Sequence, residues 1–180
     1  VEVVVDGRGQ AKVQTGHGFL DHMLAQLARH SLMDLSVAAR GDPSGAHHVV
    51  EDIAIALGRA LREAVGEGKG IRRMSHALVP MDEALALADV DVRGRGSAVV
   101  ETGLEGVLEG GLPADLLRHF LEAFATEARL TLHARLLAGK DNHHKAEALF
   151  KALAQALREA LEEDPRLGGD VPSTKGTISG

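Results

Sequence analysis

Two copies of one five-residue motif constrain this chain more than any other feature. Both read His-His-x-x-Glu, first at His47-His48 with Glu51 and again, 96 positions later (143 − 47), at His143-His144 with Glu147. If each copy begins a helix, its first His and its Glu share one face, while its second His points about 100° away. A single copy is more often a helix cap or a solvated face. Two matching copies, however, predict a site for two divalent metal ions.

The rest of the chain repeats as well. Residues 5–16 match residues 92–103, which lie 87 positions later (92 − 5), and both segments keep two turn glycines, an Ala, a Val, a Thr and a final Gly. Residues 20–24 match 117–121, and a strand predicted at 35–40 matches one at 130–135. The sequence therefore predicts an internal duplication, with too few copies for a solenoid.

Each copy is expected to contain five elements. A β-rich segment at 1–5, a turn at 6–9 and a strand at 11–16 predict a hairpin. Apolar spacing predicts a helix at 19–30, a strand at 32–39, a loop at 41–45 and a helix from His47 to the glycines near 66. Duplicated ββαβα units, each a small sheet with two helices on one face, give an α+β fold.

We expect one structural unit rather than separate domains. It comprises a first repeat at 1–70, a connector and strand at 71–91, a second repeat at 92–163 and a C-terminal loop at 164–180. In the connector, residues 79–87 begin like a loop and end like a strand. The C-terminal segment is rich in turn residues and has no apolar period, which indicates a linker or a ligand-binding loop.

Composition excludes several kinds of site and partner. The chain has no Cys and ten His, so thiolate metal sites and disulfides are absent, and His and carboxylates are the available ligands. A net charge of −6, with four Phe as the only aromatic residues, argues against nucleic acid. Because there is no apolar run of about 18 residues and no leader pattern, we expect no membrane contact and a cytoplasmic location.

Two further His extend the motifs into complete ligand sets. His22 and His119 occupy equivalent positions before the two His-His pairs, and we interpret them as ligands rather than as packing residues of the repeated helices. The eight candidate metal ligands are His22, His47, His48, Glu51, His119, His143, His144 and Glu147. Four protein ligands per ion leave positions open for substrate, which favours Mn²⁺ over Zn²⁺ and also fits Fe²⁺. The His at 17, 30, 76 and 133 lack partners at ligand spacing.

Basic and hydroxyl side chains form a second candidate component. Guanidinium groups, ammonium groups and a hydroxyl beside glycines can together bind a phosphate. The candidates are Arg73, Arg95, Lys151, Ser173 and Lys175. Each alone is more often a solvated surface group, and their spacing does not connect them to the metal ligands.

Five segments resemble one known family. They are residues 18–24 (Gly-Phe-Leu-Asp-His-Met-Leu), 47–52 (His-His-Val-Val-Glu-Asp), 79–85 (Val-Pro-Met-Asp-Glu-Ala-Leu), 142–148 (Asn-His-His-Lys-Ala-Glu-Ala) and 172–176 (Pro-Ser-Thr-Lys-Gly). In this order they are similar to the imidazoleglycerol-phosphate dehydratases of histidine biosynthesis. The resemblance spans nearly the whole chain.

The resemblance implies a fold, a reaction and an assembly. The implied fold is a duplicated ββαβα unit of the ribosomal protein S5 domain 2-like type, and the implied reaction is the dehydration of imidazole glycerol phosphate to imidazole acetol phosphate. It also implies a 24-subunit homo-oligomer with two Mn²⁺ per site at subunit interfaces. The eight His and Glu residues fall on the family's metal ligands. The five basic and hydroxyl residues fall on its contacts to substrate and phosphate.

Two features depart from the family pattern. The resemblance implies an acid/base Glu in a segment before the first strand, which would precede Val1, so the catalytic residue stays unassigned; an initial Val also suggests a processed or shortened N-terminus. Gly45-Ala46 and Val49 replace an acidic pair and a Thr, and the loop is one residue shorter, which predicts weaker support for the first motif. A dimetal phosphoester hydrolase and a non-enzymatic metal-binding shell protein are the alternative functions.

Overall fold

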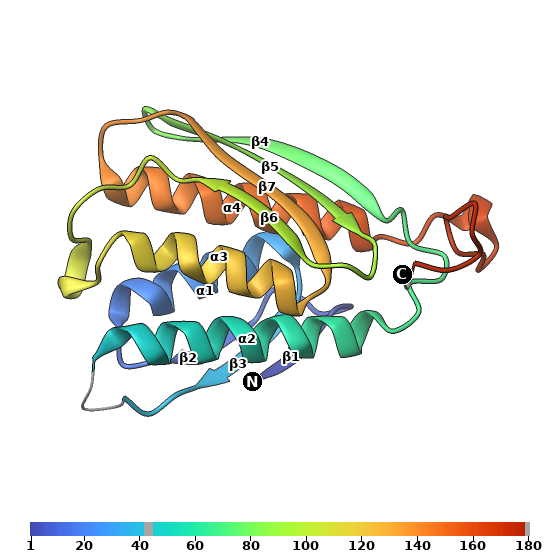
Figure 1. Cartoon of the computed structure of the whole chain (residues 1–180), viewed down its shortest axis with the longest axis horizontal. Coiled ribbons are helices and arrows are strands. Elements are labelled where there is room, and N and C mark those ends of the chain that lie inside the picture. Colours follow the sequence, from blue (N-terminus) through green and yellow to red (C-terminus); the bar gives the residue numbers. More distant parts are fainter. Residues whose placement is uncertain (42–44, 179–180) are drawn as a thin grey trace.

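The structure is a computed structural model that describes residues 1–41 and 45–178. Two sheets form the outer layers and the α-helices lie between them (Figure 1). Each sheet is therefore covered by helices on one face, as the sequence predicted. Residues 42–44 of the predicted loop at 41–45, and residues 179–180 of the predicted C-terminal loop, lie outside the described residues.

The first half contains a three-stranded sheet and two helices. Its elements are β1 (Glu2–Val4), β2 (Ala11–Gln14), α1 (Gly18–Ser31), β3 (Asp34–Ala38) and α2 (Ala46–Val65). Both helices confirm the predicted apolar stripes, since Leu20, Leu24, Leu57 and Leu61 are buried.

The predicted hairpin is wrong. β3 lies between the first two strands, antiparallel to β1 and parallel to β2. The carboxylate of Asp34, at the start of β3, accepts the backbone N–H groups of Arg8 and Gln10, both at 2.8 Å. These bonds fix the glycine-containing turn against β3, which inserts between the two strands.

The second half repeats this arrangement and adds one strand. Its elements are β4 (Met74–Met81), β5 (Ala84–Val92), β6 (Ser97–Glu101), a 3₁₀ turn η1 (Glu109–Gly111), α3 (Asp115–Glu127), β7 (Leu130–Ala138), α4 (Asn142–Leu161) and η2 (Pro165–Leu167). The sheet order is β4-β5-β7-β6. The segment predicted to begin as a loop at residue 79 is part of β4, where Pro80 is tolerated because β4 is an edge strand.

Strand register demonstrates the duplication. Leu35 of β3 pairs with Val3 on one side and Ala11 on the other, and Leu132 of β7 pairs in the same way with Val90 and Ala98. The outer strands β1 and β2 thus lie 87 positions before their counterparts β5 and β6, whereas the central strand β3 lies 97 positions before β7. The predicted match of residues 35–40 with 130–135 is therefore wrong by two residues, and β5 takes the place that β1 has in the other sheet.

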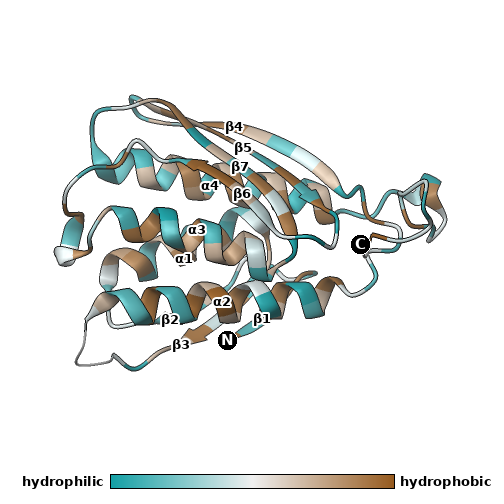
Figure 2. Cartoon of the chain, viewed as in Figure 1, coloured by the Kyte–Doolittle hydropathy of each residue, from teal (hydrophilic) through white to brown (hydrophobic). Residues whose placement is uncertain are grey.

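The two halves meet through their helices. α1 packs on α4 and α2 packs on α3, so each contact joins one helix from each half (Figure 1). The apolar sides of the helices face the interior, while polar residues lie on their outer sides (Figure 2). Gly58 permits the close approach of α2 and α3, since a Cβ there would lie 2.6 Å from the carbonyl oxygen of Phe124. No helix in the described ranges is long and apolar enough to cross a membrane.

Candidate active site

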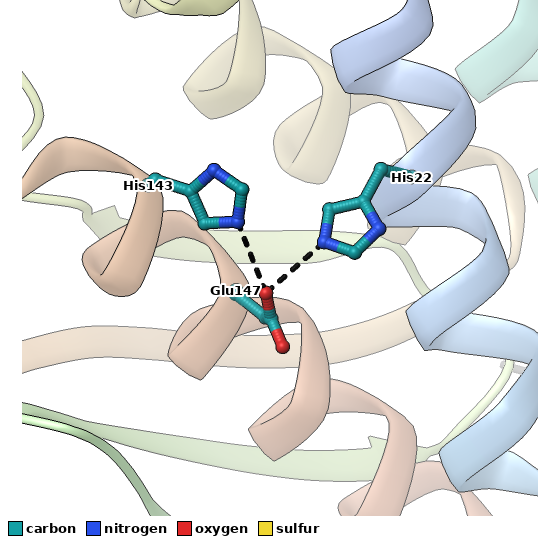
Figure 3. A group of neighbouring side chains, drawn as sticks. All are labelled: His22, His143 and Glu147. Carbon is teal, nitrogen blue, oxygen red and sulfur yellow. Dashed lines mark hydrogen bonds and ion pairs between the residues drawn. The ribbon is translucent and has the colours of Figure 1, made fainter.

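Three predicted ligands meet where α1 packs on α4. The Nε2 atoms of His22 and His143 lie 3.0 and 3.2 Å from Oε2 of Glu147 (Figure 3). Their ligand atoms lie within 4.8 Å of one another, and within residues 1–41 and 45–178 no other group of three His, Asp or Glu residues meets this limit. We call these three residues the preformed cluster.

Glu147 is a buried carboxylate held by an ammonium and an imidazole. Its side chain is 7% exposed, and its Oε1 lies 2.6 Å from the ammonium of Lys151. Burial alone would raise the pKa of Glu147, but hydrogen bonds from Lys151 and His22 outweigh burial and lower this pKa to about 2. The carboxylate is therefore ionised and able to bind a cation at neutral pH.

Local hydrogen bonds determine where α4 begins. Asp141 is the N-cap, and its side chain accepts the backbone N–H groups of His143 and His144 at 2.8 and 3.1 Å. Such a cap satisfies donors that the first helical turn leaves free. The helix then places Glu147 four residues after His143, on the same face.

The two His of the second motif face different neighbours. Nδ1 of His143 lies 3.0 Å from a carboxylate oxygen of Glu109, while its Nε2 faces the preformed cluster. Nδ1 of His144 lies 2.7 Å from Glu83, and its Nε2 lies 3.3 Å from Asp82. The hydrogen bond with Glu83 is the main cause of a raised pKa at His144. His144 therefore points to the β4–β5 turn rather than into the cluster.

The first motif forms a looser counterpart where α2 packs on α3. His47 Nε2 lies 3.7 Å from Glu51 Oε2, and the His47 and His119 rings lie 5.9 Å apart. These residues line a hollow of about 430 Å³. His119 also contacts Arg118, whose guanidinium lies 3.2 Å from its Nε2. We call His47, Glu51 and His119 the open cluster.

Each cluster combines the two halves of the chain. His22 lies beside the second motif and His119 beside the first, so the candidate ligands do not group by half. His48, the counterpart of His144, is exposed, and its ring lies 5.8 Å from that of His47.

His76 and His133 are exposed on the four-stranded sheet, where they flank Asp89 in register.

The donor set of the preformed cluster fits a divalent ion. Two imidazole nitrogens and one carboxylate oxygen point toward one region from two rigid helices. Nitrogen and oxygen donors of this kind suit Mn²⁺ or Fe²⁺ and leave further coordination positions for other ligands.

Four of the five candidate phosphate residues share one pocket. Arg73, Arg95, Ser173 and Lys175 line a cavity of about 740 Å³ between the sheet and the C-terminal segment. Arg73 donates to both oxygens of Asp91 at 2.8 and 3.3 Å and to the carbonyl of Pro172 at 2.8 Å, so it holds that segment in place. Lys151 lies instead beside Glu147, at the preformed cluster.

Sequence reasoning missed the acidic residues that support the second motif. Glu83 and Glu109 contact His144 and His143 from positions 61 and 34 residues away in the chain, a separation that spacing rules do not cover. Glu83 lies in the Val-Pro-Met-Asp-Glu-Ala-Leu segment, which had no role assigned. Asp141 carried a usable signal, because an Asp just before a helix is a common N-cap.

Comparison with known proteins shows the family of this chain. The family model described as imidazoleglycerol-phosphate dehydratase matches residues 15–157. The imidazoleglycerol-phosphate dehydratase of Dehalococcoides mccartyi strain 195 is 56% identical over 97% of this chain and 88% of its own length. The enzyme of the same name from Methanothermobacter thermautotrophicus is 49% identical over 99% and 90%.

Solved structures give the same result. A crystal structure of imidazoleglycerol-phosphate dehydratase from Staphylococcus aureus has a TM-score of 0.83 at 37% identity and covers 90% of this chain and 92% of its own. The enzyme from Pyrococcus furiosus, in complex with (S)-C348, has a TM-score of 0.77 at 36% identity, with 97% and 94% covered. The chain belongs to the imidazoleglycerol-phosphate dehydratase family and is a dehydratase of histidine biosynthesis.

Proposed function

We propose that this chain is a metal-dependent hydro-lyase that converts imidazole glycerol phosphate to imidazole acetol phosphate, with two Mn²⁺ ions in each active site. The preformed cluster of His22, His143 and Glu147 is the observation that carries the metal dependence. Its counterpart, the open cluster, supports a second ion. Family membership supports the reaction.

The chemistry explains why such an enzyme needs cations. The reaction breaks a C–H bond that no carbonyl activates, so the imidazole ring must accept the electron pair. When bound, the ions would supply Lewis acidity to the ring nitrogens and orient a substrate hydroxyl. Glu147 supplies the negative charge for one ion. Lys151, 2.6 Å from Glu147 in the free chain, is then free to donate to the substrate.

The phosphate pocket supplies the other half of substrate recognition. Arg95, Ser173 and Lys175 provide a guanidinium, a hydroxyl and an ammonium along one cavity. Charged and hydroxyl donors of this kind make strong hydrogen bonds to a phosphate dianion. Arg73 contributes by fixing the C-terminal segment that carries Ser173 and Lys175.

One chain alone does not make a complete active site. Arg73 hydrogen-bonds through its backbone to Ala160, near the end of α4, whereas His143 lies near the start of that helix. At 1.5 Å per residue, these ends lie roughly 25 Å apart, which is longer than the substrate. The C-terminal segment also lies at the far end of α4 from the helix start (Figure 1). We infer that the phosphate pocket of one chain meets the metal cluster of another.

Assembly also accounts for the second His of each motif. His144 faces the β4–β5 turn rather than the preformed cluster, and the ring of His48 is exposed, so we propose that both complete ligand sets on neighbouring chains. In such an assembly all eight candidate ligands bind metal. Each chain supplies six of them to its own two clusters, and these are His22, His47, Glu51, His119, His143 and Glu147. A closed 24-subunit particle is the proposed assembly.

The proposed chain organisation keeps the predicted boundaries. We propose that residues 1–70 and 92–163 carry the two repeats, that 71–91 connect them and include most of β5, the counterpart of β1, and that 164–180 form the substrate loop. The enzyme works in the cytoplasm, where its charged phosphorylated substrate is retained.

The deciding experiment follows product and phosphate together. Metal-free protein is supplied with imidazole glycerol phosphate and increasing Mn²⁺, and both imidazole acetol phosphate and inorganic phosphate are measured. We expect metal-dependent acetol formation without phosphate release. Phosphate release would favour the dimetal hydrolase. Metal binding without turnover, also in a chain extended before Val1 by the family's acid/base Glu segment, would favour the shell protein.

A further inference from the structure

Glu83 lies in the β4–β5 turn and contacts the second His-His motif. One carboxylate oxygen, Oε1, accepts the backbone N–H groups of Lys140 and Asp141 at 3.0 and 2.9 Å. The other, Oε2, lies 2.7 Å from Nδ1 of His144. A residue 61 positions away in the chain therefore contacts both the start of α4 and a candidate metal ligand.

We propose that Glu83 is a positioning residue that keeps the hydrogen of His144 on Nδ1 and so leaves Nε2 as the metal-binding atom. The inference rests on the proposed function, because it assigns a task to a residue that acts through His144. Metal-binding His commonly donate their other ring N–H to a carboxylate, which fixes both the tautomer and the ring orientation.

The charge of Glu83 makes this assignment specific. Its Oε1 accepts two backbone N–H groups and its Oε2 lies 2.7 Å from Nδ1 of His144, and a carboxylate held in this way can only accept. All three of its partners must therefore donate, and Nδ1 of His144 must carry a hydrogen. Nε2 lies 3.3 Å from Asp82 Oδ2, an exposed carboxylate that adds negative charge where a cation would bind.

His143 has a weaker version of the same support. Its Nδ1 contacts Glu109, whose side chain is 68% exposed, whereas the Glu83 side chain is 39% exposed and accepts from three groups. Water competes more strongly for an exposed carboxylate, so Glu83 is the better test of the principle.

Glu83→Gln tests the proposal because it changes one oxygen into a donor. The remaining amide oxygen can still accept from Lys140 and Asp141, while the amide NH₂ faces Nδ1 of His144. Nδ1 must then accept, and the hydrogen moves to Nε2. In metal-free protein labelled with ¹⁵N-His, the His144 signals should change from the Nδ1–H to the Nε2–H pattern. Affinity for Mn²⁺ alone, measured by electron paramagnetic resonance, should fall about 10- to 100-fold.

Two controls separate this role from general damage. Glu101→Gln removes an exposed carboxylate on the same sheet, one that pairs with Arg135 at 3.3 Å, and should leave Mn²⁺ affinity unchanged. In a His144→Ala background, Glu83→Gln should cause no further loss, because the residue through which Glu83 acts is absent.

The outcomes distinguish the inference from the function it rests on. If His144→Ala lowers Mn²⁺ affinity but Glu83→Gln changes neither affinity nor the His144 signals, the positioning role is wrong and the ligand assignment stands. An equal loss in the His144→Ala background would show that Glu83 acts through the backbone at 140–141, which also overturns the proposal. If His144→Ala leaves affinity intact, the ligand assignment itself fails.

Discussion

The two copies of the His-His-x-x-Glu motif have the same spacing but different surroundings. The helix of the second copy begins with the Asp141 cap, whereas that of the first begins at Gly45, which provides no side-chain cap. Glu147 is 7% exposed and paired with Lys151, whereas Glu51 is 51% exposed. The preformed cluster is thus organised before any ion binds, while the open cluster is not.

The difference arises from segments outside the repeat. Glu83 precedes β5 in the added β4–β5 hairpin, and Glu109 lies in a segment between β6 and α3 that is longer than its counterpart between β2 and α1. A duplicated sequence therefore gives equal strand register but unequal support for its two motifs. We expect the open cluster to become ordered only when metal and a neighbouring chain are present.

Loss of ligands should have the largest effect. His48→Ala and His144→Ala should each lower Mn²⁺ affinity by more than about 100-fold at one site, since ligand removal should exceed the loss of a supporting partner. His76→Ala and His133→Ala are matched controls on the exposed sheet and should keep full metal content. Metal content is measured by elemental analysis after gel filtration, and equal loss from all four variants would reject the ligand assignment.

Stability without metal should distinguish the two glutamates. Glu147→Gln leaves the largely buried ammonium of Lys151 without a counterion and should cost about 3 kcal/mol. Glu51→Gln changes a half-exposed group and should fall within about 0.5 kcal/mol of the parent. Urea unfolding of chelator-treated protein gives both values, and similar costs would mean that the first motif is as organised as the second.

Acid should destabilise the second motif through its carboxylates. The pKa values of Glu147 and Glu83 are lowered to about 2 from an ordinary 4.5, so their contribution is fully present above pH 4.5 and is lost as pH falls toward 2. Unfolding free energy of metal-free protein should drop across this window. The drop should be smaller in Glu83→Gln, and an identical pH profile would show that Glu83 is not held as described.

Removal of the helix cap should have the smallest effect. Asp141→Ala makes the start of α4 resemble that of α2 and should cost about 1 kcal/mol, the usual value of an N-cap. Thermal unfolding of the metal-free protein measures the change. A cost near zero would indicate that Glu83, which binds the backbone at 140–141, is sufficient to hold the helix start.

The sequence predicted the helices well because their apolar stripes are long and periodic. It could not fix the register of β7, because a strand pattern has period two and a shift of two residues leaves it unchanged. The hairpin prediction failed for a related reason. The turn at residues 6–9 carries the usual signals, but nothing local reveals that β3 inserts between the flanking strands.

The candidate site was predictable where residues share a helix. The pairing of His143 with Glu147 follows from i, i+4 spacing, and repetition made His22 and His119 candidate ligands. The sequence did not show that His22 lies against the second motif, because that depends on how α1 and α4 pack. Lys151 lies one turn after Glu147, a relation that helical spacing could have revealed before any phosphate role was considered.

Mixed particles of two inactive variants test most directly whether one active site needs two chains. Glu147→Ala should lose metal binding and Arg95→Ala should lose phosphate binding, so each variant should be inactive alone. The two variants are unfolded together in equal amounts, refolded with Mn²⁺ and purified as mixed particles. If each site takes its metal cluster from one chain and its phosphate pocket from another, about a quarter of the sites should have both parts intact. Dehydratase activity should therefore recover to about a quarter of the parent value. Inactive particles shown by mass spectrometry to contain both variants would contradict this expectation.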